Sequence, residues 1–176
     1  MRGFQESKKS NESSKRNSRN NNEKKNLALF DKAQFMQKKG ELNKAAELYQ
    51  NLIENNYLEE KVFLNYATIC QYLKKTNNAI ILLKEAIKTN PNNYVPFFKM
   101  GFILNNNGRF YEAYPFAKKA IDLNPRFWQG YHNLIKILIN LNRPNEAINI
   151  ARNAKNLFSD NYVFSNLLGE IFCSIG

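Results

Sequence analysis

The chain has 176 residues, of which 43% are hydrophobic and 23% charged, and its formal net charge is +11. This composition fits one ordinary domain with an apolar core, and no apolar run reaches the roughly 18 residues of a membrane span. Two cysteines cannot crosslink a secreted scaffold, and a single histidine leaves too few ligands for zinc. We therefore expect no membrane span, no metal site, no cofactor and a cytoplasmic location.

The first 25 residues differ in composition from the rest of the chain. They contain eight cationic and three acidic side chains, a net charge of +5, and no Val, Ile or Leu. Such a segment cannot bury enough apolar surface to offset the entropy lost on ordering, so residues 1–25 are predicted to be a disordered basic tail. It lacks the apolar stretch of a secretory signal peptide.

From residue 26 onward the chain repeats itself with a period of 34 residues and no shift. The residues that recur in phase fall into two sets: Ala45, Ala79, Ala113 and Ala147, and Leu52, Ala86, Ala120 and Ala154. A fixed period of this length indicates a stack of similar supersecondary units.

The units begin at residues 26, 60, 94, 128 and 162, and each is predicted to form two helices. The break falls near the fifteenth position of each unit, where Gly40, Gly108 and Asn142 tolerate a left-handed turn. Asn-Pro pairs at 90–91 and 124–125 are expected to end the second helices, because the residue before a proline is pushed out of the α region.

This pattern resembles the tetratricopeptide repeat (TPR) family, and the resemblance covers residues 26–176. It implies an all-α fold, a right-handed superhelical stack of antiparallel helix pairs, with repeats at 26–59, 60–93, 94–127 and 128–161 and a half repeat at 162–176. The family places small residues where its two helices pack closely. The matching positions are Ala33, Ala45, Ala67, Ala79, Ala86, Gly101, Ala113, Ala120, Ala147 and Ala154.

Four residues depart from the family pattern. Lys32 stands where the first unit should carry an aliphatic residue. Ile135 replaces a small residue in the fourth unit, and Ser159 departs from the pattern near the end of that unit, so looser local packing is expected there. Pro115 falls inside the second helix of the third unit, where it removes one hydrogen bond and is expected to bend the helix.

No catalytic constellation is present in the sequence. It has no glycine-rich phosphate loop, no HExxH motif and no nucleophile elbow. His132 is the only histidine, and Cys70 and Cys173 lie more than 100 residues apart. We expect no catalytic residues and no enzymatic activity.

In the TPR family the first helices line a concave groove that binds extended peptides. The positions carried over to this chain combine lysines, amides and aromatic residues. They are Phe30, Gln34, Lys38, Lys61, Asn65, Gln71, Tyr72, Phe98, Phe102, Asn105, His132, Asn133 and Lys136. This acid-free surface suits an extended peptide with acidic and apolar side chains, so the resemblance implies a protein or peptide partner and a non-catalytic interaction scaffold. The competing interpretation is that these residues are merely solvated helix faces.

Two alternative functions stay open at this stage. A basic tail followed by such repeats resembles the substrate-recruiting arm of a glycosyl- or sulfotransferase whose catalytic domain is missing from this chain. The tail could instead bind nucleic acid or another anionic surface. Nucleic acid is the less favoured partner, because Phe4 is the only aromatic residue among the tail charges. Residues 162–176 leave an apolar helix without a partner helix, which predicts a cap, self-association or a longer chain of which this one is a fragment.

Overall fold

The structure is a computed structural model that describes residues 3–175, with side chains described from residue 20 to 173. The described residues form nine helices and no strand, which confirms the all-α prediction. The helices are α1 (Gly3–Lys38), α2 (Leu42–Glu54), α3 (Glu60–Tyr72), α4 (Thr76–Thr89), α5 (Tyr94–Asn106), α6 (Phe110–Leu123), α7 (Trp128–Asn140), α8 (Pro144–Leu157) and α9 (Val163–Ile175).

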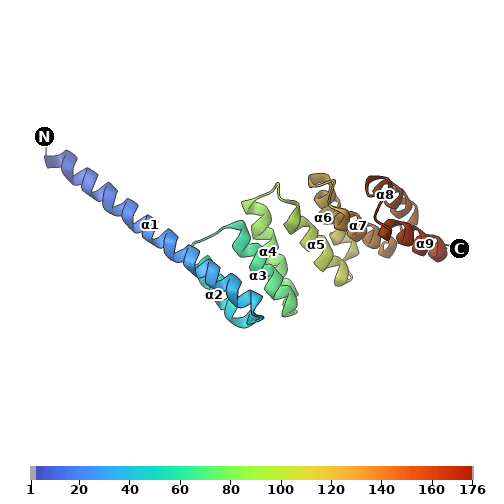
Figure 1. Ribbon diagram of the computed structural model, residues 1–176, viewed down its shortest axis with the longest axis horizontal. Coiled ribbons are helices and arrows are strands. Elements are labelled where there is room, and N and C mark those ends of the chain that lie inside the picture. The colour runs from blue at the N-terminus through green and yellow to red at the C-terminus, as the bar shows by residue number, and fades with distance from the viewer. Residues whose placement is uncertain (1–2, 176) are drawn as a thin grey trace.

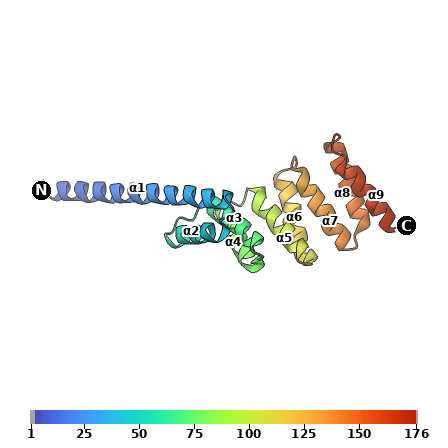
Figure 2. The same cartoon turned by 60° about the horizontal axis from the view of Figure 1, so that its bottom comes forward.

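The helices are arranged as successive antiparallel hairpins that stack into an elongated solenoid (Figure 1). Each hairpin packs on the next, so α2 contacts α3, α4 contacts α5, and α6 contacts α7. The chain runs from one end of the stack to the other, and α1 projects well beyond it on the N-terminal side (Figure 2). Because each hairpin buries its apolar face against its neighbours, the core is continuous along the stack.

The hairpin turns have the same backbone conformation in all four complete units. Gly40, Lys74, Gly108 and Asn142 have φ angles of 79°, 57°, 72° and 56°. Glycine and asparagine favour this left-handed region, whereas a lysine there is less common. The turn is therefore kept even where Lys74 replaces the residue type that suits it.

The Asn-Pro pairs end the second helices as predicted. Helix α4 ends at Thr89 with Asn90 as its C-cap, and α6 ends at Leu123 with Asn124 as its C-cap. The next helix then starts on a side-chain cap, because the Asn93 oxygen accepts a hydrogen bond of 2.9 Å from the Val95 N–H.

Small side chains form a buried seam between the helices. The recurring residues Ala45, Ala79, Ala113, Ala147, Leu52, Ala86, Ala120 and Ala154 are all fully buried. At Gly101 an added Cβ would lie only 3.1 Å from the backbone nitrogen of Ala117, which shows how closely α5 and α6 approach. Residues of this size are needed because larger side chains would push the helices apart.

Two of the departures from the repeat pattern affect their hairpins differently. Helix α6 runs from Phe110 to Leu123 through Pro115 without interruption. Ile135 is fully buried in the core around α7. Helices α7 and α8 approach each other over fewer residues than the two helices of any other complete unit, which agrees with the looser packing predicted there.

Helix α1 begins at Gly3, so the segment 3–25 is helical where the composition predicts disorder. The side chains of residues 20–25 are exposed. This segment continues a helix that packs on α2, and proline, the strongest helix breaker, first occurs at residue 91. Ten of the 23 residues from 3 to 25 are Ser or Asn, which have low helix propensity, so the disorder of residues 1–25 stays a prediction.

Helix α9 closes the stack at its C-terminal end. Phe164, Leu167 and Ile171 are buried against the preceding hairpin, while Phe172 remains about half exposed. None of the helices in the described part of the chain is both long and apolar enough to cross a membrane.

Candidate functional site: the surface of the first helices

The first helices of successive hairpins, α1, α3, α5, α7 and α9, supply most of the residues around two cavities. Equivalent positions along this surface differ from unit to unit, with Gln34, Thr68, Phe102 and Lys136 each 34 residues apart. The surface therefore changes its chemistry along the stack, while the seam beneath it stays the same.

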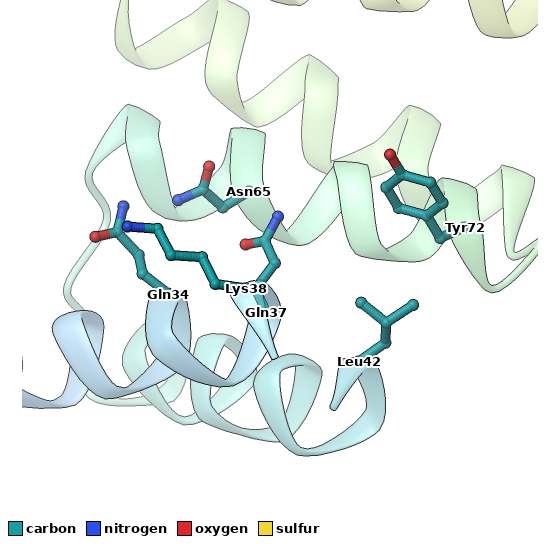
Figure 3. A pocket seen from close by; sticks show the side chains of 6 residues that line it. All are labelled: Gln34, Gln37, Lys38, Leu42, Asn65 and Tyr72. Carbon is teal, nitrogen blue, oxygen red and sulfur yellow. The ribbon is translucent and has the colours of Figure 1, made fainter. Parts of the chain in front are cut away.

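The first cavity, the amide pocket, has a volume of about 470 Å³ and lies between α1 and α3. It is lined by Gln34, Gln37, Lys38, Leu42, Asn65 and Tyr72. Figure 3 shows the polar side chains of α1 reaching toward Asn65, with Leu42 and Tyr72 on the other side of the pocket. The pocket therefore combines three amides and one cation with the apolar surfaces of Leu42 and Tyr72.

A hydrogen-bonded chain fixes the floor of the amide pocket. The buried Tyr49 hydroxyl donates to the Gln37 oxygen and accepts from the Asn65 amide nitrogen, each at 3.1 Å. Burial raises the pKa of the Tyr49 hydroxyl, which therefore stays protonated and available as a donor. Asn65 is thus held in place by a partner within the chain.

The second cavity, the aromatic pocket, has a volume of about 500 Å³ and lies among α5, α7 and α9. It is lined by Phe98, Phe102, Asn105, Asn106, Trp128, Gln129, His132, Asn133, Lys136, Asn140 and Val163. The rings of Phe98 and Phe102 have centroids 6.1 Å apart, and the edge of Phe127 packs on Phe98 at 4.8 Å. These three rings therefore form one contiguous aromatic wall.

The charges at the rim of the aromatic pocket are largely compensated. The Lys136 ammonium lies 2.8 Å from a carboxylate oxygen of Glu170. Burial and the nearby Lys136 charge lower the pKa of His132, which Glu170 raises to a smaller extent, so the imidazole is neutral at pH 7. The pocket therefore presents a nearly neutral surface.

Asn133 is the most unusual polar residue of the site. Its side chain is only 4% exposed, and its amide nitrogen is buried without a hydrogen-bond partner among the described residues. Asn65 occupies the same phase two units earlier, and its amide nitrogen is satisfied by Tyr49. The aromatic pocket thus contains a donor that the protein itself does not use.

Lys99 lies on α5 between the two pockets. Its ammonium donates a 3.0 Å hydrogen bond to the Thr68 hydroxyl, which in turn donates to the Leu64 carbonyl oxygen at 2.8 Å. Desolvation lowers the pKa of the Lys99 ammonium, and no carboxylate in the described part of the chain forms an ion pair with it. The hydrogen bond of Lys99 joins α5, which carries Phe98 of the aromatic pocket, to α3, which carries Asn65 of the amide pocket.

Most of the residues expected in the groove line one of these pockets. Those in the amide pocket are Gln34, Lys38, Asn65 and Tyr72, and those in the aromatic pocket are Phe98, Phe102, Asn105, His132, Asn133 and Lys136.

Three expected groove residues line neither pocket. Phe30 packs edge-on against Tyr49, with ring centroids 6.0 Å apart, because the buried tyrosine offers it an apolar surface. Lys61 is exposed on α3, and Gln71 lines a smaller cavity with Lys74.

Seven pocket residues are absent from the sequence-based set, namely Gln37, Leu42, Asn106, Trp128, Gln129, Asn140 and Val163. Three of them lie outside the interior of a first helix. Leu42 belongs to a second helix, and Trp128 and Val163 stand at the starts of α7 and α9. The family pattern places groove residues only inside the first helices. The aromatic character of Trp128, the single tryptophan, is the signal that could have identified it.

The described residues contain no cluster of three or more His, Cys, Asp or Glu side chains that could share a metal ion. Burial raises the pKa of the Cys70 thiol, which disfavours the thiolate needed for nucleophilic chemistry.

Comparisons with solved structures show the same fold. The part of MamA of Desulfovibrio magneticus RS-1 from residue 41 onward superposes with a TM-score of 0.76 and 14% identity, over 83% of this chain and 82% of that one. YrrB, a TPR protein with an unusual peptide-binding site, gives 0.73 and 15% over 83% and 75%. PilF of Pseudomonas aeruginosa gives 0.72 and 15% over 87% and 70%.

Sequence comparison identifies the repeats directly. No curated protein matches the chain in sequence. A family model described as tetratricopeptide repeat matches residues 60–93 and 96–127, which correspond to α3–α4 and α5–α6. Together with the 34-residue period and the helical stack, this match shows that the chain contains tetratricopeptide repeats.

Proposed function

We propose that this protein is a non-catalytic interaction scaffold that binds an extended peptide along the surface of its first helices. The observation that carries the proposal is the presence of two differently built pockets on that surface, one rich in amides and one walled by aromatic rings. Amides suit the hydrogen-bonding groups of a peptide backbone, and an apolar pocket suits one of its side chains. The peptide-binding site of YrrB, which has the same fold, gives the proposal further support.

The charge of the surface favours an acidic segment in the same peptide. Lys38 is exposed at the amide pocket, and Lys99 lies between the pockets without a carboxylate partner among the described residues. An acidic side chain at either place would gain an ion pair without displacing an existing one. The proposed ligand is therefore a peptide with one apolar anchor and at least one acidic residue.

A peptide-array experiment tests this function. Wild-type protein is incubated with linear peptides of about ten residues that vary in apolar and acidic content. The double variant Phe98→Ala/Phe102→Ala should bind at least about 10-fold more weakly, because it removes the aromatic wall. Tyr111→Ala is the matched control, since Tyr111 is 83% exposed and lines neither pocket. Equal binding by the double variant and the wild type would contradict the proposed site.

A further inference from the structure

We propose that the aromatic pocket receives one aromatic side chain of the bound peptide, while the Asn133 amide donates a hydrogen bond to a backbone carbonyl oxygen beside that side chain. This inference rests on the proposed function, because it assumes that a peptide occupies the surface of the first helices. It specifies which residue of the peptide is selected and which group of the protein forms a hydrogen bond with the peptide backbone.

The evidence for the hydrogen bond is the unused donor itself. Buried polar groups in proteins are nearly always hydrogen-bonded, so each exception needs an explanation. The Asn133 amide nitrogen is buried, has no partner in the described part of the chain, and belongs to a side chain that lines the pocket. An oxygen atom of a ligand would accept the missing hydrogen bond from this nitrogen, and a peptide offers carbonyl oxygens at regular intervals.

Packing does not demand an asparagine at this position. Leu167 occupies the same phase one unit later and is 2% exposed, so the stack accepts an apolar side chain there. Asn65, at that phase two units earlier, has a partner in Tyr49. Asn133 differs from both, since it is neither apolar nor satisfied.

The evidence for an aromatic side chain is the composition and charge of the pocket. Phe98, Phe102 and Trp128 line it, and Phe102 is 39% exposed, so one aromatic surface remains open. Rings prefer edge-on or offset contacts with centroids about 4.5–7 Å apart, a spacing that an inserted ring would continue. Because Glu170 already pairs with Lys136, an acidic side chain would gain little in this pocket.

The first step of the test is a selection from a random library of linear peptides against the wild-type full chain. Enriched peptides should share one aromatic residue. The strongest is then synthesised with blocked termini, together with a version in which alanine replaces the aromatic residue. Fluorescence anisotropy should show at least about 10-fold weaker binding for the alanine version.

The second step tests Asn133 with variants that keep the fold. Asn133→Leu copies the residue found at Leu167, and Asn133→Asp keeps the shape but removes the donor. Both should bind the aromatic peptide about 10-fold more weakly or worse, while Tyr111→Ala, at a residue that lines neither pocket, binds it as the wild type does. In amide NMR spectra of the wild type, the side-chain signals of Asn133 should move on peptide binding.

The possible outcomes separate the two proposals. If Asn133→Leu stays folded and binds as the wild type does, or if the selected peptides lack an aromatic residue, the present inference is wrong and the scaffold function stands. If no linear peptide is enriched by the wild-type protein, both proposals are wrong. A thermal midpoint of Asn133→Leu at or above that of the wild type excludes misfolding as the cause of lost binding.

Discussion

The buried seam and the surface of the first helices are built on the same 34-residue period but follow it in opposite ways. In the seam, Ala45, Ala79, Ala113 and Ala147 repeat one residue type, and all are fully buried. On the surface, Gln34, Thr68, Phe102 and Lys136 change type in every unit. Every unit of the seam packs two helices closely together, so small residues recur there. The surface of the first helices has no such constraint, so it is free to vary and can match a ligand along its length.

The largest effect is expected from disrupting the seam. Ala113→Arg places a long cation in a fully buried position between closely packed helices. It should lower the free energy of unfolding by about 3 kcal/mol or more, because it both overpacks the core and buries an unpaired charge. Urea denaturation measures the change. An unaltered midpoint would mean that this position does not belong to the seam.

Smaller effects are expected at Asn65 and Asn133, which occupy the same position of the repeat. The two effects should have opposite signs. Asn65→Leu removes the hydrogen bond to Tyr49 and should destabilise the protein by about 1 kcal/mol. Asn133→Leu removes an unsatisfied donor and should stabilise it by about 1 kcal/mol. Thermal and urea unfolding of the pair give the comparison. Loss of stability in both variants would show that Asn133 has a structural partner.

Gly101 and Gly169 lie 68 residues apart at the same position of the repeat, yet replacing each with alanine should change stability differently. Gly169→Ala should stabilise the protein by about 0.5–1 kcal/mol, because alanine favours the helix and no atom lies within 4 Å of the new Cβ. Gly101→Ala gains the same propensity but pushes against the Ala117 backbone at 3.1 Å. Parallel thermal melts should therefore rank Gly169→Ala above Gly101→Ala. The reverse order would contradict the close approach of α5 and α6.

The smallest effect is a pH dependence at the aromatic pocket. Desolvation and Lys136 lower the pKa of His132 below its ordinary value of 6.5. The unfolded chain therefore binds the proton first, and stability should fall as the pH drops below that value. His132→Gln should flatten this part of the profile of thermal midpoint against pH. Because the pKa of Glu170 is lowered below 4.5, its titration lies outside this window. An identical profile for the variant would contradict the assigned environment.

The fold could be predicted from the sequence because the repeat pattern is local and periodic. Helices α3, α5 and α7 begin at Glu60, Tyr94 and Trp128, the residues at which the repeating units start. The turns follow the same logic, since Gly40 and Gly108 mark left-handed positions directly. The helical backbone of residues 3–25 could not be predicted from composition alone, because the low content of apolar residues says nothing about continuation from an anchored helix.

The candidate site was only partly predictable. The phase of the repeat indicates which side chains of a first helix point outward, but it does not show which neighbour each will meet. Phe30 shares its phase with Phe98, yet it packs on Tyr49, whereas Phe98 lines the aromatic pocket. Trp128 was missed because a pocket wall can come from a helix start that the family pattern does not include.

The sequence by itself determined the period, the helix pairs and the small residues of the seam, because each repeating unit must bury its apolar face in the same way. Only the tertiary structure decided which surface side chains are satisfied within the chain and which are left for a ligand. Asn65 and Asn133 share one phase, yet only Asn65 meets a tyrosine hydroxyl. That difference arises because hydrogen bonding depends on partners from other helices, whose positions are fixed only when the hairpins stack.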